Sequence, residues 1–414
     1  MRRLVKLSAL VISTAALAIA ACVADEPNEP TNNDSDGSTS SDGSSTNDGS
    51  SGGDGSGCTS AQTACGGSCV ELDTDKKNCG SCGHDCLGGD CNDSKCVPTA
   101  VFTGTADAAT GGVQTIAVDP KGIYWATPIV PTPGAPAHNS NIYSCPLTGD
   151  CVAPMIVEPS VPEVDQMRVT PGQPNSLFFT EAEFDFFFQI GTRQDGGQLG
   201  DPCGSGGNPC QHSGPAAYAL ALDDTTVFYG SNPNGNGSVY RVTLADAGSI
   251  NIGSSSAPMQ QIAIDADEAT HAYVYAATTN VIQAFAFGNA VASLTNSISQ
   301  AEQIVVGHSL VFWTSPVDGK IYTVPTCPVG SVCATDQTPT TFASYPISRA
   351  ITADATNIYW SGGTGDILSC PLTGCTGGVP TKLASGTATV RAITTDATTI
   401  YWGDDSGSIY RVAK

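Results

Sequence analysis

The clearest pattern in the chain is a hydrophobic segment that recurs from residue 97 onward. Residues 350–360 (AITADATNIYW) are matched without a gap by residues 392–402 (AITTDATTIYW), and residues 116–125 (IAVDPKGIYW) are an earlier copy. Weaker copies bring the total to seven units. Each unit has three residues at the position of Ile358-Tyr359-Trp360, which we call the aromatic slot; in the weaker copies they are Leu177-Phe178-Phe179, Val227-Phe228-Tyr229, Tyr273-Val274-Tyr275 and Val311-Phe312-Trp313. A fixed period of about 40 to 45 residues is typical of repeat architectures such as propellers.

Each unit predicts an antiparallel meander, with an apolar strand, an Asp-containing turn, an aromatic strand and a third strand after a Gly-bearing loop. Alternation places Ile358 and Trp360 on one face of the second strand and Tyr359 on the other, so that strand must be buried on both sides. Radially packed sheets meet this demand. We therefore predict an all-β fold, a β-propeller over residues 97–414 with seven blades, or six if the divergent second unit is an insertion. All four tryptophans fall in the aromatic slot and form its core: Trp125, Trp313, Trp360 and Trp402.

The ends of the repeat region predict how the ring closes. The last unit stops after three strands at Lys414, while residues 99–104 (TAVFTG) match the fourth strand of the preceding unit, residues 381–386 (TKLASG). We expect the N-terminal strand to complete the last blade, which removes the exposed edges that favour aggregation.

The aromatic motif resembles the YWTD class of propellers known from lipoprotein receptors, and more loosely NHL-type and lyase-type bacterial propellers. The resemblance covers residues 97–414. Ala126, Ser361 and Gly403 stand where the class has Thr. The resemblance implies a propeller fold, and the YWTD class itself has six blades.

The pattern at the N-terminus is that of an export signal over residues 1–21. Three basic residues precede an apolar run from Leu7 to Ala20, which is too short for a permanent membrane span. Ile19-Ala20-Ala21-Cys22 resembles the lipobox of bacterial lipoproteins, which implies that Cys22 is lipidated and anchors the protein to a membrane. Val23 follows, and the resemblance then favours the outer membrane, with the leaflet left open. The alternative is an ordinary signal peptide with Cys22 as a spare thiol.

Residues 22–57 are rich in Ser, Gly, Asp, Asn and Thr and nearly lack apolar side chains. Such a segment cannot bury a core, so we expect a disordered linker behind the lipidated cysteine.

Residues 58–96 form a third region, defined by its cysteines. Eight of them in about forty residues predict a small disulfide-rich module, since so short a segment buries little apolar area. The pairing is open, because eight cysteines allow 105 connectivities. A zinc site of Cys79, Cys82, His84 and Cys86 is the alternative. The eight cysteines are Cys58, Cys65, Cys69, Cys79, Cys82, Cys86, Cys91 and Cys96.

The cysteines of the propeller region fall in close pairs. The chain has 17 cysteines, an odd number that lipidation of Cys22 would explain. Each pair is expected to clip one hairpin: Cys145 with Cys151, Cys203 with Cys210, Cys327 with Cys333, and Cys370 with Cys375.

Composition narrows the partners. The formal net charge is -23 and Lys and Arg total only 16, which excludes nucleic acid as a partner, because binding requires clustered basic residues. No cofactor is predicted. Calcium binding by the scattered acids is an open possibility, although no ordered ligand spacing supports it.

Candidate chemistry is sparse. The Asp of the first turn recurs in five units, at Asp119, Asp223, Asp265, Asp354 and Asp396, and we interpret it as a turn cap. The second unit carries Phe184, Asp185 and Phe186, a possible binding surface on the face that it shares with the Pro-rich loop 127–139. The leading hypothesis is a non-enzymatic protein that binds a protein, peptide or glycan on that face. The alternatives are a propeller lyase or hydrolase with a site at the central channel, and a scaffold for outer-membrane assembly.

Overall fold

The structure is a computed structural model that describes residues 57–104, 112–128, 139–147, 151–162, 164–170, 176–181, 186–191, 210–213, 217–223, 225–232, 235–243, 249–265, 273–286, 290–329, 332–363, 365–386 and 388–414. Within these ranges the chain forms seven four-stranded antiparallel sheets and two short two-stranded hairpins. The prediction of an all-β propeller is confirmed.

Each sheet is a meander in chain order. The first contains β6 (Thr115–Val118), β7 (Gly122–Pro128), β8 (Asn139–Pro146) and β9 (Met155–Pro162). The second contains β10 (Val164–Val169), β11 (Ser176–Glu181), β12 (Phe186–Gly191) and β13 (Cys210–Ser213). The third contains β14 (Ala217–Leu222), β15 (Thr226–Ser231), β16 (Ser238–Thr243) and β17 (Ser249–Ser254). The fourth contains β18 (Met259–Ile264), β19 (Tyr273–Thr278), β20 (Ile282–Ala286) and β21 (Ala290–Ser293).

The remaining three sheets follow the same order. The fifth contains β22 (Ile304–Gly307), β23 (Leu310–Ser315), β24 (Lys320–Pro325) and β25 (Thr340–Ser344). The sixth contains β26 (Ile347–Ala353), β27 (Asn357–Gly362), β28 (Ile367–Pro371) and β29 (Thr381–Ala384), with the 3-10 turn η2 (Thr376–Gly378) before its last strand. The seventh contains β30 (Val390–Thr395), β31 (Thr399–Asp404), β32 (Ile409–Ala413) and β5 (Thr99–Phe102).

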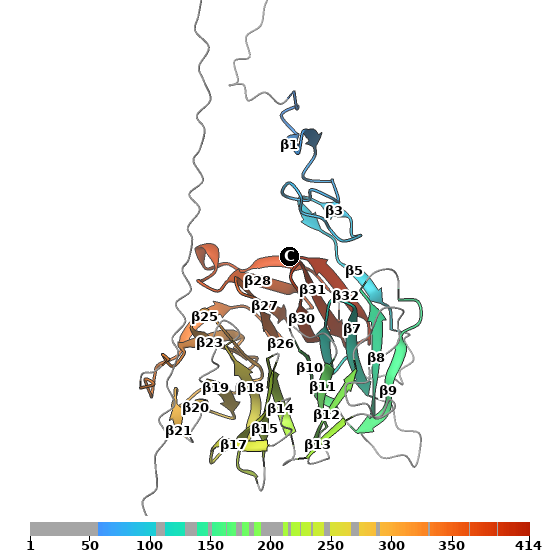
Figure 1. Ribbon diagram of the computed structural model, residues 1–414. Coiled ribbons are helices and arrows are strands. Elements are labelled where there is room, and N and C mark those ends of the chain that lie inside the picture. The colour runs from blue at the N-terminus through green and yellow to red at the C-terminus, as the bar shows by residue number, and fades with distance from the viewer. Residues whose placement is uncertain are drawn as a thin grey trace, which may run out of the picture. The chain divides into compact units, whose positions relative to one another are not determined.

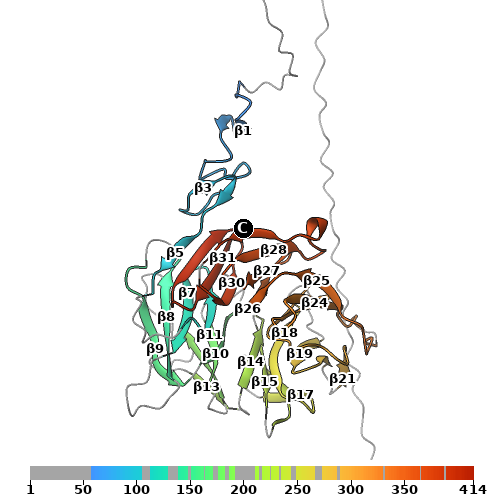
Figure 2. The same cartoon turned by 180° about the vertical axis from the view of Figure 1, so that it is seen from behind.

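The sheets form a closed ring. The first strand of each sheet contacts the first strand of the next, from β6 through β10, β14, β18, β22 and β26 to β30, and β30 contacts β6 again. Figures 1 and 2 show the sheets around this ring from two sides, with β9 and β21 at opposite edges. These seven innermost strands surround the central channel.

The closure predicted from the sequence is confirmed. Strand β5 pairs antiparallel with β32, with Phe102 opposite Ile409 and Thr99 opposite Arg411. The first and last strands of the propeller therefore share one sheet, and neither leaves an open edge there.

The aromatic slot packs between neighbouring sheets. Trp313 and Trp360 are fully buried, and Trp125 and Trp402 are 1% and 4% exposed. Ile358 and Trp360 share a cluster with Phe312 of the preceding sheet, whereas Tyr359 packs in the cluster that contains Trp402 of the following sheet. The predicted two-sided burial of the second strand is thus present, and apolar side chains hold adjacent sheets together.

The segment before the propeller contains two hairpins, β1 (Thr63–Cys65) with β2 (Ser68–Val70) and β3 (Cys91–Asn92) with β4 (Lys95–Cys96). Four disulfides cross-link it: Cys58–Cys69, Cys65–Cys82, Cys79–Cys91 and Cys86–Cys96. The disulfide-rich module predicted for residues 58–96 is therefore present, and its pairing, which the sequence left open, is defined.

Several predictions fall outside the described residues. They are the signal segment, Cys22, the linker as far as residue 56, Cys203, Phe184 and Asp185.

Candidate functional site

The recurrent Asp side chains cap the turns between first and second strands. Oδ1 of Asp354 accepts hydrogen bonds from the backbone amides of Thr356 and Asn357, both at 2.8 Å. Asp119, Asp223 and Asp396 repeat this arrangement, each with two amides at 2.6–2.9 Å. These aspartates therefore stabilise their own turns, as the side chains of Asp and Asn commonly do.

The last two sheets extend this turn into a polar cluster. Oδ2 of Asp354 accepts hydrogen bonds from the Tyr359 hydroxyl at 2.9 Å and from Lys414 Nζ at 2.6 Å. Lys414 Nζ also donates to the backbone oxygen of Asp396, at 2.6 Å. Burial opposes ionisation of Asp354, yet the hydrogen bonds from Lys414, Thr356 and Asn357 outweigh it and hold the pKa of that carboxyl well below its usual range. The cluster attaches the end of the chain to the sixth sheet.

The central channel of the propeller is a candidate ligand site. It has a volume of about 810 Å³, within the range of small-molecule sites, and residues of all seven innermost strands line it. Its wall is mixed, with aliphatic side chains such as Ile116, Leu222, Ile264 and Val305 beside polar ones. The channel therefore has the size of a ligand cavity, with both apolar and polar side chains in its wall.

The strand register places seven residues at one level of this wall. In every sheet, one residue of the innermost strand lies opposite the middle residue of the three that form the aromatic slot. In the second sheet it is Arg168, opposite Phe178. The seven residues are Ala117, Arg168, Ala221, Ile264, Val305, Thr352 and Thr394. We call this set the channel ring; Arg168 is its one charged member.

Two glutamines, each two residues before a member of the channel ring, connect neighbouring innermost strands. Oε1 of Gln166 accepts a hydrogen bond from the amide of Leu220 at 3.0 Å, and Oε1 of Gln303 accepts one from the amide of Ile351 at 3.1 Å. Each bond crosses from one sheet to the next. These amides therefore support the ring of strands.

The sequence did not single out the channel ring. Its members can be recognised as equivalent only from the pairing of the strands, which aligns the divergent second unit with the other six. The available signal was the Arg in residues 164–169 (VDQMRV), at a place where the clear copies have Ala or Thr.

The proposed loop surface is represented only by Phe186, the first residue of β12, whose backbone pairs with Ser213 of β13. Phe184 and Asp185 lie outside the described residues, as does most of the Pro-rich loop. The binding surface therefore stays a prediction.

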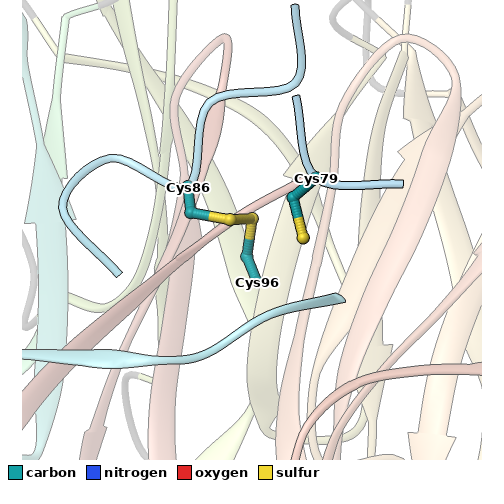
Figure 3. Close-up of side chains that lie close together, drawn as sticks. All are labelled: Cys79, Cys86 and Cys96. Atoms are coloured by element: carbon teal, nitrogen blue, oxygen red, sulfur yellow. A yellow bond between two sulfur atoms is a disulfide. The ribbon is translucent and has the colours of Figure 1, made fainter. Parts of the chain in front are cut away.

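The alternative zinc set is divided among three disulfides. Cys79, Cys82 and Cys86 each bond to a different cysteine, and Nδ1 of His84 lies 2.6 Å from the backbone oxygen of Cys79. Figure 3 shows Cys79 beside the Cys86–Cys96 disulfide, and one sulfur from each of the three lies within 4.8 Å of the others. Zinc binds thiolates, which a disulfide does not offer, so the oxidised module has no such site at these residues.

The propeller disulfides lie in one slot, between the third and fourth strands of their sheets. The structure joins Cys145 to Cys151, Cys327 to Cys333 and Cys370 to Cys375. Cys203 is outside the described residues, so the fourth pair stays a prediction. Loops this short are worth only about 2 kcal/mol each by chain entropy.

Two further features bear on function. His308, in the turn after β22, is exposed, and within the described ranges no hydrogen bond or ion pair joins it to an acid. In the same ranges, no helix is long and apolar enough to cross a bilayer.

Comparison with known proteins gives similarity in fold. No protein-family model matches the chain, and no curated protein matches it. A catalytically inactive histidine-to-alanine variant of virginiamycin B lyase from Staphylococcus aureus, solved with quinupristin, is similar with a TM-score of 0.53 and 14% identity, covering 76% of this chain and 98% of that one. The WD40 propeller domain of Doa1 is similar with a TM-score of 0.54 and 11% identity, covering 77% and 97%. At these identities the likeness shows the fold alone, that of a β-propeller.

Proposed function

We propose that the protein is an exported lipoprotein, anchored through Cys22, whose propeller binds a protein, peptide or glycan by the loops of one face. The disulfide-rich module acts as a spacer or second contact, and the linker keeps both away from the membrane. The anchor and the export signal rest on the lipobox-like sequence at residues 19–22.

The observation that supports the binding role is that the recurrent aspartates bond to the backbone of their own turns. In four turns the Asp side chain is occupied by two backbone amides of its own turn. The repeats thus serve the scaffold, and recognition falls to the segments that differ between units. Loops on a rigid scaffold are a common place for binding residues.

Mass spectrometry of the protein isolated from membranes tests the anchor. We expect the N-terminal peptide to begin at Cys22 and to carry acyl groups. A Cys22→Ala variant should be released from the membrane fraction with its propeller intact. A free thiol at Cys22 in the wild-type protein would contradict the anchor.

Crosslinking on intact cells, followed by partner identification, tests the binding role. We expect one dominant partner in the wild-type protein and loss of its crosslink in a Phe184→Ala, Asp185→Ala double variant. A Val379→Ala variant, changed at an exposed side chain near η2, serves as the control and should keep the crosslink. An equal yield from wild type and double variant would exclude this loop as the binding surface.

An enzyme remains the second candidate because one similar fold belongs to a lyase. That likeness extends to the fold only. If the propeller were a lyase or hydrolase, the purified protein should cleave the ligand that it captures, and a single substitution in the channel should abolish this cleavage. The binding role predicts instead that the captured ligand is recovered unchanged.

A further inference from the structure

The channel ring contains one residue that packing alone does not explain. Five of its seven members are Ala, Val or Thr, the sixth is Ile264, and Arg168 alone carries a charge. A partly buried guanidinium at this level is costly, because a charged group loses hydration when it is removed from water. Such a residue needs a partner to offset that cost.

Among the described residues, the guanidinium of Arg168 has one hydrogen-bond acceptor. Arg168 is partly buried, and Nη1 donates a hydrogen bond to the backbone oxygen of Met167 at 2.9 Å. Across the described residues, no ion pair joins Arg168 to a carboxylate, and its other guanidinium donors have no hydrogen bond there. Burial lowers the pKa of the guanidinium, as expected for a cation held away from water. Arg168 lines the channel, and it is the single basic residue among those that do.

Polar side chains that make no hydrogen bond to a described residue also line the channel. Thr394 and Thr352 occupy the channel ring two and three sheets away from Arg168. Neither hydroxyl makes a hydrogen bond to a residue that the structure describes. Gln261 also lines the channel without such a bond, unlike Gln166 and Gln303, which connect strands.

The acids of the wall restrict the charge of a ligand. Asp119 and Asp396 lie in the turns at one end of the channel, and Asp165 is exposed near the start of β10. These carboxylates repel additional negative charge, so a single anionic group opposite Arg168 is better tolerated than two.

We propose that the central channel is a binding site for a small organic monoacid, with its carboxylate on Arg168, its apolar body against Ala117, Ala221 and Val305, and further polar atoms toward Thr352 and Thr394. The planar guanidinium suits a carboxylate because two of its N–H groups can bond both oxygens. The site lies in the channel and is independent of the loop face.

Isothermal titration of the full mature protein with 2-naphthoate tests the site. We expect one saturable site, and an affinity at least about tenfold lower for Arg168→Gln, the loss typical of a hydrogen bond to a charged group. The uncharged analogue 2-naphthalenemethanol should bind wild type and variant alike and more weakly than the acid binds wild type. The diacid 2,6-naphthalenedicarboxylate should bind wild type more weakly than 2-naphthoate.

Arg349→Gln is the matched control, because it removes the same charge from an innermost strand at a side chain outside the channel lining, where it pairs with Glu302. It should bind 2-naphthoate like wild type. Arg168→Lys, which keeps the charge and loses the planar fork, should bind with intermediate affinity and serves if the Gln variant fails to fold. Absence of 2-naphthoate binding to wild type, or equal affinity of wild type and Arg168→Gln, would overturn the proposal.

Discussion

The module at residues 58–96 and the propeller are held together by different means. In the module, the buried residues are four cysteines, Cys79, Cys86, Cys91 and Cys96, together with Gly89. The propeller buries whole aromatic and aliphatic side chains between its sheets, and its disulfides close only short hairpin loops. A short segment with little apolar area depends on cross-links, whereas a ring of repeats gains its stability from packing at every sheet interface.

The two regions meet at Arg411. Its guanidinium donates to the backbone oxygen of Leu87 in the module at 3.1 Å, to that of Leu147 in the first sheet at 2.9 Å, and to the Thr99 hydroxyl at 3.3 Å. The buried cysteines of the module also share an apolar cluster with Trp402 and Val412 of the seventh sheet. The cross-linked module thus adds its small apolar surface to the seam at which the propeller closes.

The largest expected effect is the loss of the module on reduction. Each of its disulfides closes a loop of 10 to 17 residues, worth about 3 kcal/mol in the chain-entropy account. With dithiothreitol, hydrogen exchange should reach the unfolded rate across residues 58–96 while the innermost strands of the propeller stay protected.

The same experiment on a Cys370→Ala, Cys375→Ala variant without reductant is the control, and it should affect exchange only near η2. Protection of the module after complete reduction would show that packing, and not cross-linking, holds it.

A smaller but still large effect is expected from opening the propeller core. Trp360→Ala should reduce the free energy of unfolding by about 3–5 kcal/mol, because it removes a fully buried aromatic between two sheets. Chemical denaturation measures the change. The module should keep its hydrogen-exchange protection under conditions where the propeller remains folded.

Val379→Ala, at a side chain that is 69% exposed, is the matched control and should change stability by less than about 0.5 kcal/mol. A loss below about 1 kcal/mol for Trp360→Ala would mean that the slot does not carry the interface.

The sequence predicts the propeller better than its channel for a physical reason. The aromatic slot and the Asp turn recur because every sheet must solve the same packing and turn problem, so Trp360 and Asp354 are visible as copies of Trp402 and Asp396. Even the closing strand is readable, since residues 99–104 resemble a fourth strand.

Arg168 is different. Its meaning depends on strand register, because only pairing with Phe178 places it level with Thr352 and Thr394 across the channel. The contact of Arg411 with Leu87 is likewise absent from any local pattern, because the two residues are far apart in the chain. The disulfide pairing of the module is hidden for the same reason.

The smallest expected effect concerns the ion pair between Asp354 of the sixth sheet and Lys414 at the end of the chain. Asp354→Asn keeps the turn cap to the amides of Thr356 and Asn357 but removes the charge that Lys414 contacts, so the free energy of unfolding at pH 7 should fall by about 1 kcal/mol. The folded-state pKa of Asp354 lies below its ordinary value of 3.8. The wild-type advantage is therefore complete above pH 5 or so and disappears as the pH falls through the folded-state pKa.

Lys414→Gln should cost about as much, and the double variant little more than either single one, because both substitutions remove the same ion pair. Denaturation at pH 7 and at about pH 3 measures all four proteins. Two results would contradict this prediction: additive losses, or a difference between wild type and Asp354→Asn that grows toward low pH. Either would show that the ion pair of Asp354 and Lys414 does not stabilise the contact between the sixth and seventh sheets, and that packing holds these sheets together without it.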